Sequence, residues 1–169
     1  MSANAYSSAL LISKKGWNTI LKATLIAGIL DITAALVMFY LKTKKSPVLV
    51  LKYITSAIIG KSAYSDGLLM PLLGLLLHFI IAFIWATIFF LLYPKIISLL
   101  KNSVVAGLLY GVVVWLVMNL LVLPITQVPK SPFNLPQALT GMLVLMLAIG
   151  LPIALIVDTY YRRDKVTLS

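Results

Sequence analysis

Three polar residues lie within long apolar stretches of the sequence, and they are the groups through which this chain could do chemistry. Asp31 lies in AGILDITAALVMFYLK (residues 27–42), His78 is the only histidine, and Asn119 lies in VMNLLVLPI (residues 117–125). An aspartate beside an imidazole can take up and release a proton near neutral pH, and an amide can hydrogen-bond to either group. These residue types favour a proton-titrating pair, or a polar lining for a small substrate.

The same residues also have a structural interpretation. A buried ionised aspartate costs several kcal/mol unless it pairs or reaches water, and His78 is the natural partner for Asp31. Such a pair can equally be a hydrogen-bonded staple that fixes the register of two helices, and Asn119 is typical of a residue that bonds helices together. Both interpretations place Asp31 toward the protein and away from lipid.

The composition indicates which solvent these helices face. The chain has 169 residues, of which 62% are hydrophobic and 11% charged, whereas soluble domains are about 45–50% apolar and about 25% charged. Its mean hydropathy is +1.07. A chain of this composition must use lipid as part of its solvent.

The short inventory of reactive residues excludes several kinds of site. The sequence has no Cys and no Glu, so disulfides, thiolate chemistry and a complete zinc site are excluded, and no metal or cofactor is expected. A haem held by His78 and a methionine such as Met118 or Met146 is the one alternative, but methionines in apolar helices are ordinary packing residues.

Four apolar blocks predict the fold. They cover residues 23–41, 68–93, 103–124 and 135–157, and about 20 helical residues suffice to cross about 30 Å of hydrocarbon. The prediction is an all-α membrane protein: one domain (1–169) with four transmembrane helices in a bundle. Lys95 and Lys101 are expected in a tight turn between the second and third helices.

The two longer connections differ in kind. Residues 46–67 are apolar but too short and broken to span, and they predict an interfacial or re-entrant helix at about 46–62. Residues 124–136 carry prolines at 124, 129, 132 and 136, a density that predicts a stiff, extended strap. The two connections together are expected to cover one end of the bundle.

Small residues predict the helix faces that pack together, because they let helix backbones approach closely. Asp31 shares a face with Gly28, and His78 shares one with Gly74 and Ala82. Asn119 follows Gly107 and Gly111 at helical spacing, and the expected inner stripe of the fourth helix is Gly141, Leu145, Ala148 and Pro152. Measured along each helix from the long-loop side, Asp31, His78 and Asn119 lie about 16, 10 and 8 Å deep, which allows one polar cluster.

A faint internal repeat accompanies these stripes. LKATLIAGIL (21–30) resembles LKNSVVAGLL (100–109), and both are followed by LVM. The repeat favours two duplicated helical hairpins related by an axis along the membrane normal, although chance similarity between apolar helices is the alternative.

The basic residues bear on orientation and partners. With four spans both termini share a side, which holds eight of the 14 Lys and Arg residues, and the opposite loops hold six. The positive-inside rule then favours cytoplasmic termini in a bacterial inner membrane. The net charge of +10 is spread over loop ends, so it suggests anionic lipid headgroups and no nucleic acid.

Several motifs in residues 71–163 carry a family resemblance. They are YPKI (93–96), AGLLYG (106–111), VMNLLVLPI (117–125) and SPFNLP (131–136), followed by the Arg162–Arg163 tail. In these the chain resembles the YagU-like group of bacterial inner-membrane proteins, while the N-terminal quarter matches less well. The resemblance implies a multi-span inner-membrane protein loosely associated with acid stress, and it brings no catalytic residues.

Three functions remain open from the sequence. The first is an oligomeric transporter or proton-linked permeability factor, in which several copies or a partner complete the path. The second is an accessory or assembly subunit of a larger membrane complex. The third, an intramembrane enzyme acting on lipid or quinone with Asp31 and His78 as acid and base, is the weakest, because nucleophile and metal options are nearly absent.

Overall fold

The regular structure of the chain is helical wherever it is described. The computed structural model describes residues 13–65, 67–129, 132 and 134–167, the last four by their backbone only. Asp66 and Lys130 lie outside these ranges. In chain order the helices are α2 (Lys14–Thr43), α3 (Val48–Ile59), the 3-10 helix η1 (Gly60–Tyr64), α4 (Leu69–Leu100), α5 (Ser103–Val117), the π-helix η2 (Met118–Val122), α6 (Leu123–Ile125), α7 (Leu135–Leu145), the π-helix η3 (Met146–Gly150) and α8 (Leu151–Thr167).

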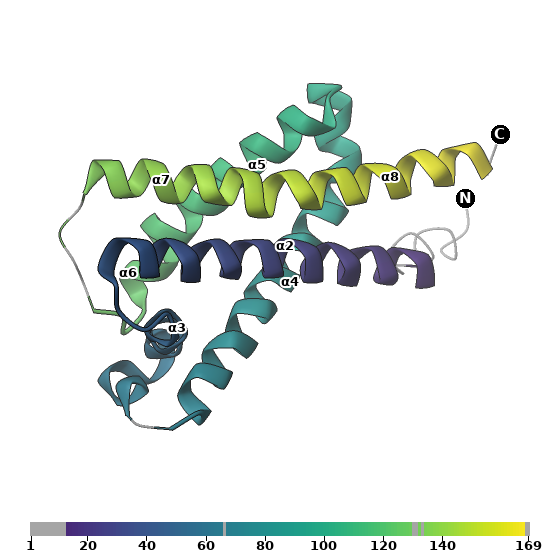
Figure 1. Cartoon of the computed structure of the whole chain (residues 1–169). Coiled ribbons are helices and arrows are strands. Elements are labelled where there is room, and N and C mark those ends of the chain that lie inside the picture. The colour runs from purple at the N-terminus through teal and green to yellow at the C-terminus, as the bar shows by residue number, and fades with distance from the viewer. Residues whose placement is uncertain (1–12, 66, 130–131, 133, 168–169) are drawn as a thin grey trace.

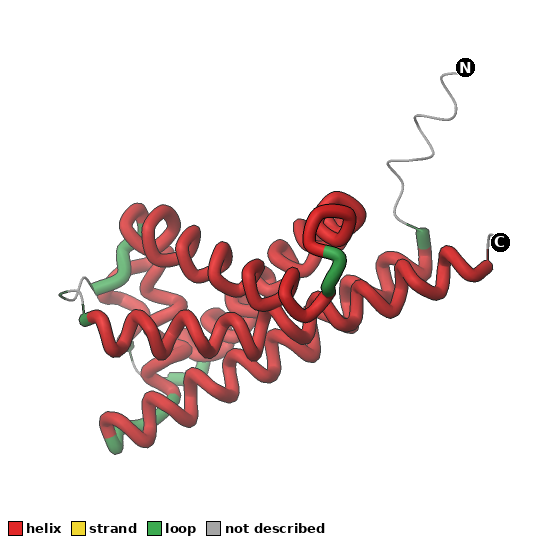
Figure 2. Tube along the Cα trace, turned by 90° about the horizontal axis from the view of Figure 1, so that it is seen from above, coloured by secondary structure: helices red, strands yellow, loops and turns green. Residues whose placement is uncertain are grey.

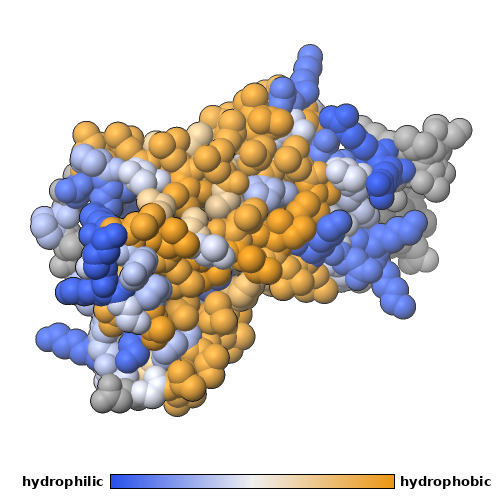
Figure 3. Space-filling view, in the orientation of Figure 1, coloured by the Kyte–Doolittle hydropathy of each residue, from blue (hydrophilic) through white to orange (hydrophobic). Residues whose placement is uncertain are grey.

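Four of the helical runs are long and apolar enough to cross a membrane. They are Lys14–Thr43, Leu69–Leu100, Ser103–Ile125 and Leu135–Arg163. Figure 3 shows the corresponding surface: a hydrophobic band covers the middle of the molecule, and hydrophilic side chains gather at its two ends. The predicted all-α class with four such helices is confirmed, and the chain is a multi-pass membrane protein by this criterion.

The four long helices form two differently directed pairs. In Figure 1, α2 and the run α7–η3–α8 lie side by side and antiparallel, while α4 and α5 cross them obliquely. The beginning of α2 and the end of α8 lie at the same end of the molecule, as Figure 2 also shows. We call this the terminal end. The opposite end carries α3, which Figure 1 views nearly end-on while α2 runs across the page.

The core lies where α2, α4, α5 and α8 meet. Small residues of α2 face aromatic residues of α4, which allows the backbones to approach while large rings fill the remaining space. The most deeply buried members are Ile20, Ala23, Ala27, Ala86, Phe89, Tyr93, Ala106, Val114, Ile153, Ala154 and Val157.

The second spanning helix is longer than the sequence indicates. The sequence predicts a turn containing Lys95 directly after Pro94, but α4 continues through both residues to Leu100. Proline lacks the N–H that would bond to the carbonyl four residues earlier, which here belongs to Phe90. The hydroxyl of Tyr161 donates to that carbonyl oxygen at 3.0 Å. A side chain of α8 thus satisfies the acceptor that Pro94 leaves unpaired, and only Lys101 lies in the turn.

Two other prolines follow π-helical turns. Leu123 precedes Pro124 and donates its N–H to the carbonyl of Met118, and Leu151 precedes Pro152 and donates to Met146. Each bond reaches back five residues, so the extra residue accommodates a ring that would clash with the carbonyl one turn earlier. The helices of the third and fourth spans therefore continue through Pro124 and Pro152.

Polar contacts tie the connecting segments at the end opposite the termini. Gln127 of the proline-rich strap donates its backbone N–H to Ala57 and its side-chain amide to Ile58, at the end of α3. Gln137 accepts from Lys42 at 2.8 Å. The predicted strap, residues 124–136, is non-helical at its described residues 126–129, 132 and 134. Its outer prolines, Pro124 and Pro136, lie in the ends of α6 and α7.

The contact between α3 and α4 predicts a stability effect. Thr55 is 2% exposed, and its hydroxyl donates to the carbonyl of Met70 at 2.6 Å. Thr55→Val keeps the shape but removes this bond, so we expect a loss of about 1 kcal/mol in the free energy of unfolding. Chemical unfolding in mixed micelles, followed by circular dichroism, measures it. Thr140→Val is the control, because the exposed Thr140 bonds only within its own helix. Equal losses in the two variants would show that the Thr55–Met70 hydrogen bond does not stabilise the contact between α3 and α4.

Candidate functional site

Asp31 and His78 meet at the interface between α2 and α4. Oδ2 of Asp31 lies 4.0 Å from Nδ1 of His78, and the two side chains are 18% and 11% exposed. The second ring nitrogen, Nε2, lies 2.9 Å from the carbonyl oxygen of Gly28. The carboxylate is thus turned toward a protein partner, one helical turn from the carbonyl that holds the ring.

The Gly28 contact determines which ring nitrogen can exchange a proton. A carbonyl oxygen only accepts, so Nε2 carries the hydrogen in this contact. The neutral imidazole then presents the lone pair of Nδ1 to Asp31, and the imidazolium presents an N–H. One proton held on either Nδ1 or Oδ2 makes the pair attractive, whereas two bare lone pairs would repel. The separation of 4.0 Å exceeds a direct hydrogen bond, and a small side-chain rotation or one water closes it.

The close approach of α2 and α4 at this point depends on small residues. A Cβ on Gly28 would lie 2.7 Å from the ring of Phe79 and 3.6 Å from Ala82. Ala82 itself is 3% exposed. Gly28 thus makes room for the residue next to His78, and its carbonyl orients the His78 ring.

The pair lies well inside the first span. Asp31 is 17 residues from Lys14 and 12 residues from Thr43, about 25 and 18 Å along the helix. Of the acids whose side chains the structure describes, the other is Asp158, which is engaged near the terminal end. Asp31 and His78 therefore form an isolated titratable pair among the described side chains of the spans.

Asn119 does not join this pair. Its amide donates to the carbonyl of Trp115 at 2.9 Å, one turn earlier on its own helix. Among the described residues no hydrogen bond links it to Asp31 or His78. Asn119 lies in η2, which continues α5. α5 packs on α4, α7, η3 and α8, whereas α2 packs on α3, α4, α7, η3 and α8. Position along the helices therefore does not indicate which helices are neighbours.

The predicted small-residue positions serve different contacts. Gly74 packs on α3, where a Cβ would collide with the carbonyl oxygen of Leu51. Gly107 packs on α8, where a Cβ would lie 2.8 Å from the Cβ of Ala154. Gly141 makes the loosest contact, since a Cβ there would meet only the indole of Trp115, at 3.3 Å.

Another tight helix crossing involves a glycine outside the predicted stripes. A Cβ on Gly150 would collide with the carbonyl oxygen of Gly107 and lie 2.7 Å from the N–H nitrogen of Gly111. Gly107 and Gly111 form a GxxxG pair, the spacing at which helices in membranes approach most closely. The sequence did carry a signal: MNLLVLPI (118–125) and MLAIGLPI (146–153) share the form M-x-x-x-x-L-P-I, and Gly150 lies in the second copy.

A second polar cluster lies near the terminal end. The hydroxyl of Tyr93 donates to Oδ1 of Asp158, and Nε of Arg162 lies 2.8 Å from Oδ2. Of these contacts, only the pairing of Asp158 with Arg162, four residues apart, follows from helical spacing. The Tyr93 ring stacks on Tyr161 with centroids 5.1 Å apart. This cluster therefore joins α4 to α8 beside the hydrogen bond from Tyr161 to the Phe90 carbonyl.

The Tyr93 hydroxyl is expected to stabilise the fold measurably. Tyr93 is 2% exposed, and Tyr93→Phe would remove a charge-assisted bond to Asp158. We expect the free energy of unfolding to fall by about 1.5 kcal/mol, measured by chemical unfolding in mixed micelles. Tyr40→Phe is the matched control, because Tyr40 is 49% exposed and should change stability little. If the Tyr93→Phe protein were as stable as the control, the Tyr93–Asp158 hydrogen bond would not stabilise the fold.

The donor set offers little to a metal or a haem. Within the described residues, no group of three or more His, Cys, Asp or Glu side chains comes together. Both ring nitrogens of His78 already face protein groups, Gly28 and Asp31. The arrangement is suited to holding and moving a proton.

Comparison with known proteins yields no relative. No protein-family model matches the chain, and searches of curated proteins and of solved structures find no significant match. The resemblance to the YagU-like group stays a prediction.

Proposed function

We propose that this protein moves protons, or a small solute coupled to protons, across the membrane, with Asp31 and His78 as the proton-carrying pair. The observation that carries the proposal is the isolated acid–imidazole pair within two spanning helices, oriented by the carbonyl of Gly28. Ionisable residues within spans are costly, and they commonly mark proton or ion pathways.

The geometry supports a relay better than a static staple. Because Nε2 is held by Gly28, Nδ1 faces Asp31. A proton on Nδ1 passes to Oδ2 once rotation of the Asp31 side chain or one water closes the 4.0 Å gap. Both side chains are partly exposed on the single chain, and within the span this surface faces lipid or a neighbouring subunit. Four spans enclose little volume, and several copies of the chain, or a partner, are expected to complete the path.

Proteoliposomes provide the test. Purified protein is reconstituted with a pH-sensitive dye inside, a pH step is applied outside, and valinomycin with potassium balances the charge. We expect the internal pH to follow the step faster than in protein-free liposomes, in proportion to the amount of protein. Rates equal to those of protein-free liposomes at every protein density would remove the transport proposal.

One observation favours a second function, an accessory subunit of a membrane complex. An open apolar groove of about 350 Å³ lies between α2 and α4, lined by Leu21, Thr24, Leu25, Phe79, Ile80 and Phe83. It begins within two turns of the Asp31–His78 pair, and an apolar helix of another membrane subunit would fill it and cover the pair. A stoichiometric partner that co-purifies with the wild-type protein but not with a Leu25→Trp variant supports this function; isolation as a self-contained active unit counts against it.

The finer assignments belong to the same proposal. A bacterial inner membrane with cytoplasmic termini agrees with the excess of basic residues at the terminal end. The interfacial position of α3 agrees with its apolar sequence and with its direction across the end of the molecule (Figure 1). Fusing a reporter that is active only in the cytoplasm to each terminus distinguishes the two orientations.

A further inference from the structure

A groove with a marked positive charge lies between the beginning of α2 and the end of α8. It has a volume of about 490 Å³ and is lined by Lys15, Thr19, Lys22, Leu155, Ile156, Thr159, Tyr160 and Arg163. Three of these eight residues are cationic, three carry hydroxyl groups and none is acidic. Ser13 and Tyr160, whose hydroxyl oxygens lie 3.1 Å apart, join the two helices at this end.

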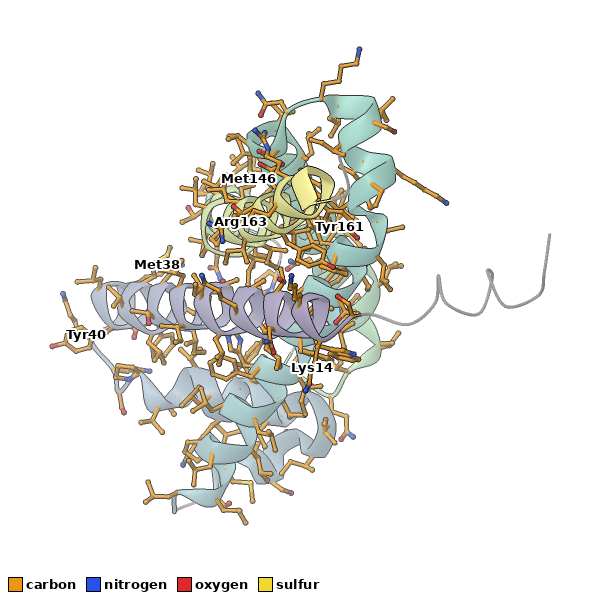
Figure 4. All side chains as sticks on the ribbon, turned by 90° about the vertical axis from the view of Figure 1, so that its right-hand side faces the viewer. Lys14, Met38, Tyr40, Met146, Tyr161 and Arg163 are labelled. Atoms are coloured by element: carbon orange, nitrogen blue, oxygen red, sulfur yellow. The ribbon has the colours of Figure 1, made fainter. Side chains whose placement is uncertain are left out.

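The described acid of this part of α8 does not face the groove. Asp158 is the nearest described acid on α8, and its carboxylate is bonded to Tyr93 and Arg162. Successive residues of a helix are rotated by about 100°. The side chain of Asp158 therefore projects from α8 in a direction well over 90° away from that of the residues that line the groove. Figure 4 shows the same division: Arg163 lies on the flank of α8 toward α2, and Tyr161 lies on the flank toward α4.

The lining changes in character along the groove. Lys15 and Lys22 are seven residues apart, so about 10 Å of α2 separates them, and the apolar side chains of Leu155 and Ile156 contribute to the wall on α8. Two of the spans, Lys14–Thr43 and Leu135–Arg163, meet at this groove. A site with cations and an apolar wall at the end of two spans is complementary to a phosphate that carries acyl chains.

We propose that the α2–α8 groove binds a phosphate group, supplied by the headgroup of an anionic lipid. Lys15, Lys22 and Arg163 provide both the charge and the N–H donors. The hydroxyls of Thr19 and Thr159 already donate to the carbonyls of Lys15 and Leu155. The apolar wall accommodates the first methylenes of the chains. A free phosphate shares this chemistry but has no use for the apolar wall.

Lipid selectivity measures this site in the full chain. The protein is reconstituted in phosphatidylcholine with spin-labelled phosphatidylglycerol or spin-labelled phosphatidylcholine, and electron paramagnetic resonance gives the relative association constant. We expect the wild type to prefer phosphatidylglycerol. In the K15Q/K22Q double variant, the association constant for phosphatidylglycerol relative to phosphatidylcholine should fall about tenfold. Arg163→Gln should lower the preference independently.

The matched control removes the same charge at the same end of the molecule. K95Q/K101Q changes two lysines near the α4–α5 turn that do not line the groove, and it should keep the wild-type preference. Equal losses in the two double variants, or no preference in the wild type, would overturn the site. Circular dichroism during heating checks that each variant is folded.

Inorganic phosphate distinguishes the two sources. Added in excess, it should leave the phosphatidylglycerol preference of the wild type unchanged if the lipid is the ligand. If phosphate displaces the labelled lipid from the wild type at concentrations that have no effect on K15Q/K22Q, the site is a phosphate site with a soluble ligand, and the lipid assignment is wrong.

Discussion

Gly150→Ala is expected to lower the free energy of unfolding by about 2 kcal/mol, although alanine is the better helix former. A Cβ at this position would meet backbone atoms of Gly107 and Gly111, which cannot rotate away. Forcing two packed backbones apart costs about 3 kcal/mol, and the helix propensity of alanine offsets about 1 kcal/mol. Reversible unfolding in mixed micelles, followed by circular dichroism, measures the difference.

Gly141→Ala is the matched control on the same helical run. A methyl group there meets only the side chain of Trp115, at 3.3 Å, and a side chain can shift by a few tenths of an ångström. Its stability should stay within about 1 kcal/mol of the wild type, on either side. If Gly150→Ala proved as stable as Gly141→Ala, the crossing of α5 with η3 would be looser than described.

Asp31→Asn is expected to slow pH-driven proton entry into proteoliposomes at least about a hundredfold, the lower end of the range for losing a positioned acid–base group. Asparagine keeps the size of the side chain and a hydrogen-bonding oxygen, so helix packing should survive. It cannot hold the proton that the pair shares. His78→Gln should have a similar effect, since its amide can still donate toward Gly28 but cannot relay a proton.

The combination of the two changes separates a relay from two unrelated defects. If Asp31 and His78 act as one unit, the double variant should be no slower than the slower single variant. Asn119→Ala serves as the control, because Asn119 bonds only to Trp115 on its own helix, and it should retain wild-type flux. Wild-type flux in Asp31→Asn would exclude this carboxylate from the pathway.

The fold class was predictable from the sequence because it depends on local quantities. The length and hydropathy of each apolar block were enough to predict four helices that could cross a membrane. The meeting of Asp31 with His78 was also within reach, since a buried acid needs a partner and the chain has a single imidazole.

What the sequence could not show depends on contacts between distant segments. The continuation of α4 past Pro94 requires the hydroxyl of Tyr161, 67 residues later, at the carbonyl of Phe90. The Tyr93–Asp158 bond joins residues 65 positions apart. Neither contact leaves a pattern within one helix, so the sequence predicts that the helix ends before Pro94 and gives no indication that Tyr93 bonds to Asp158.

The placement of Asn119 failed for a related reason. Depth in the membrane follows from counting residues, but helix adjacency does not. Depth alone places Asn119 in the polar cluster, but the α5–η2 run that carries it does not pack extensively on α2.

The contact between Asp31 and His78 underlies the proposed function, and cysteine cross-linking in membranes tests it most directly. Because the native chain has no cysteine, the paired substitutions Asp31→Cys/His78→Cys and Asp31→Cys/Asn119→Cys each introduce only two thiols. A short bis-thiol reagent should cross-link the first pair within one chain and leave the second pair open. Cross-linking of 31 to 119 with none between 31 and 78 would contradict the site.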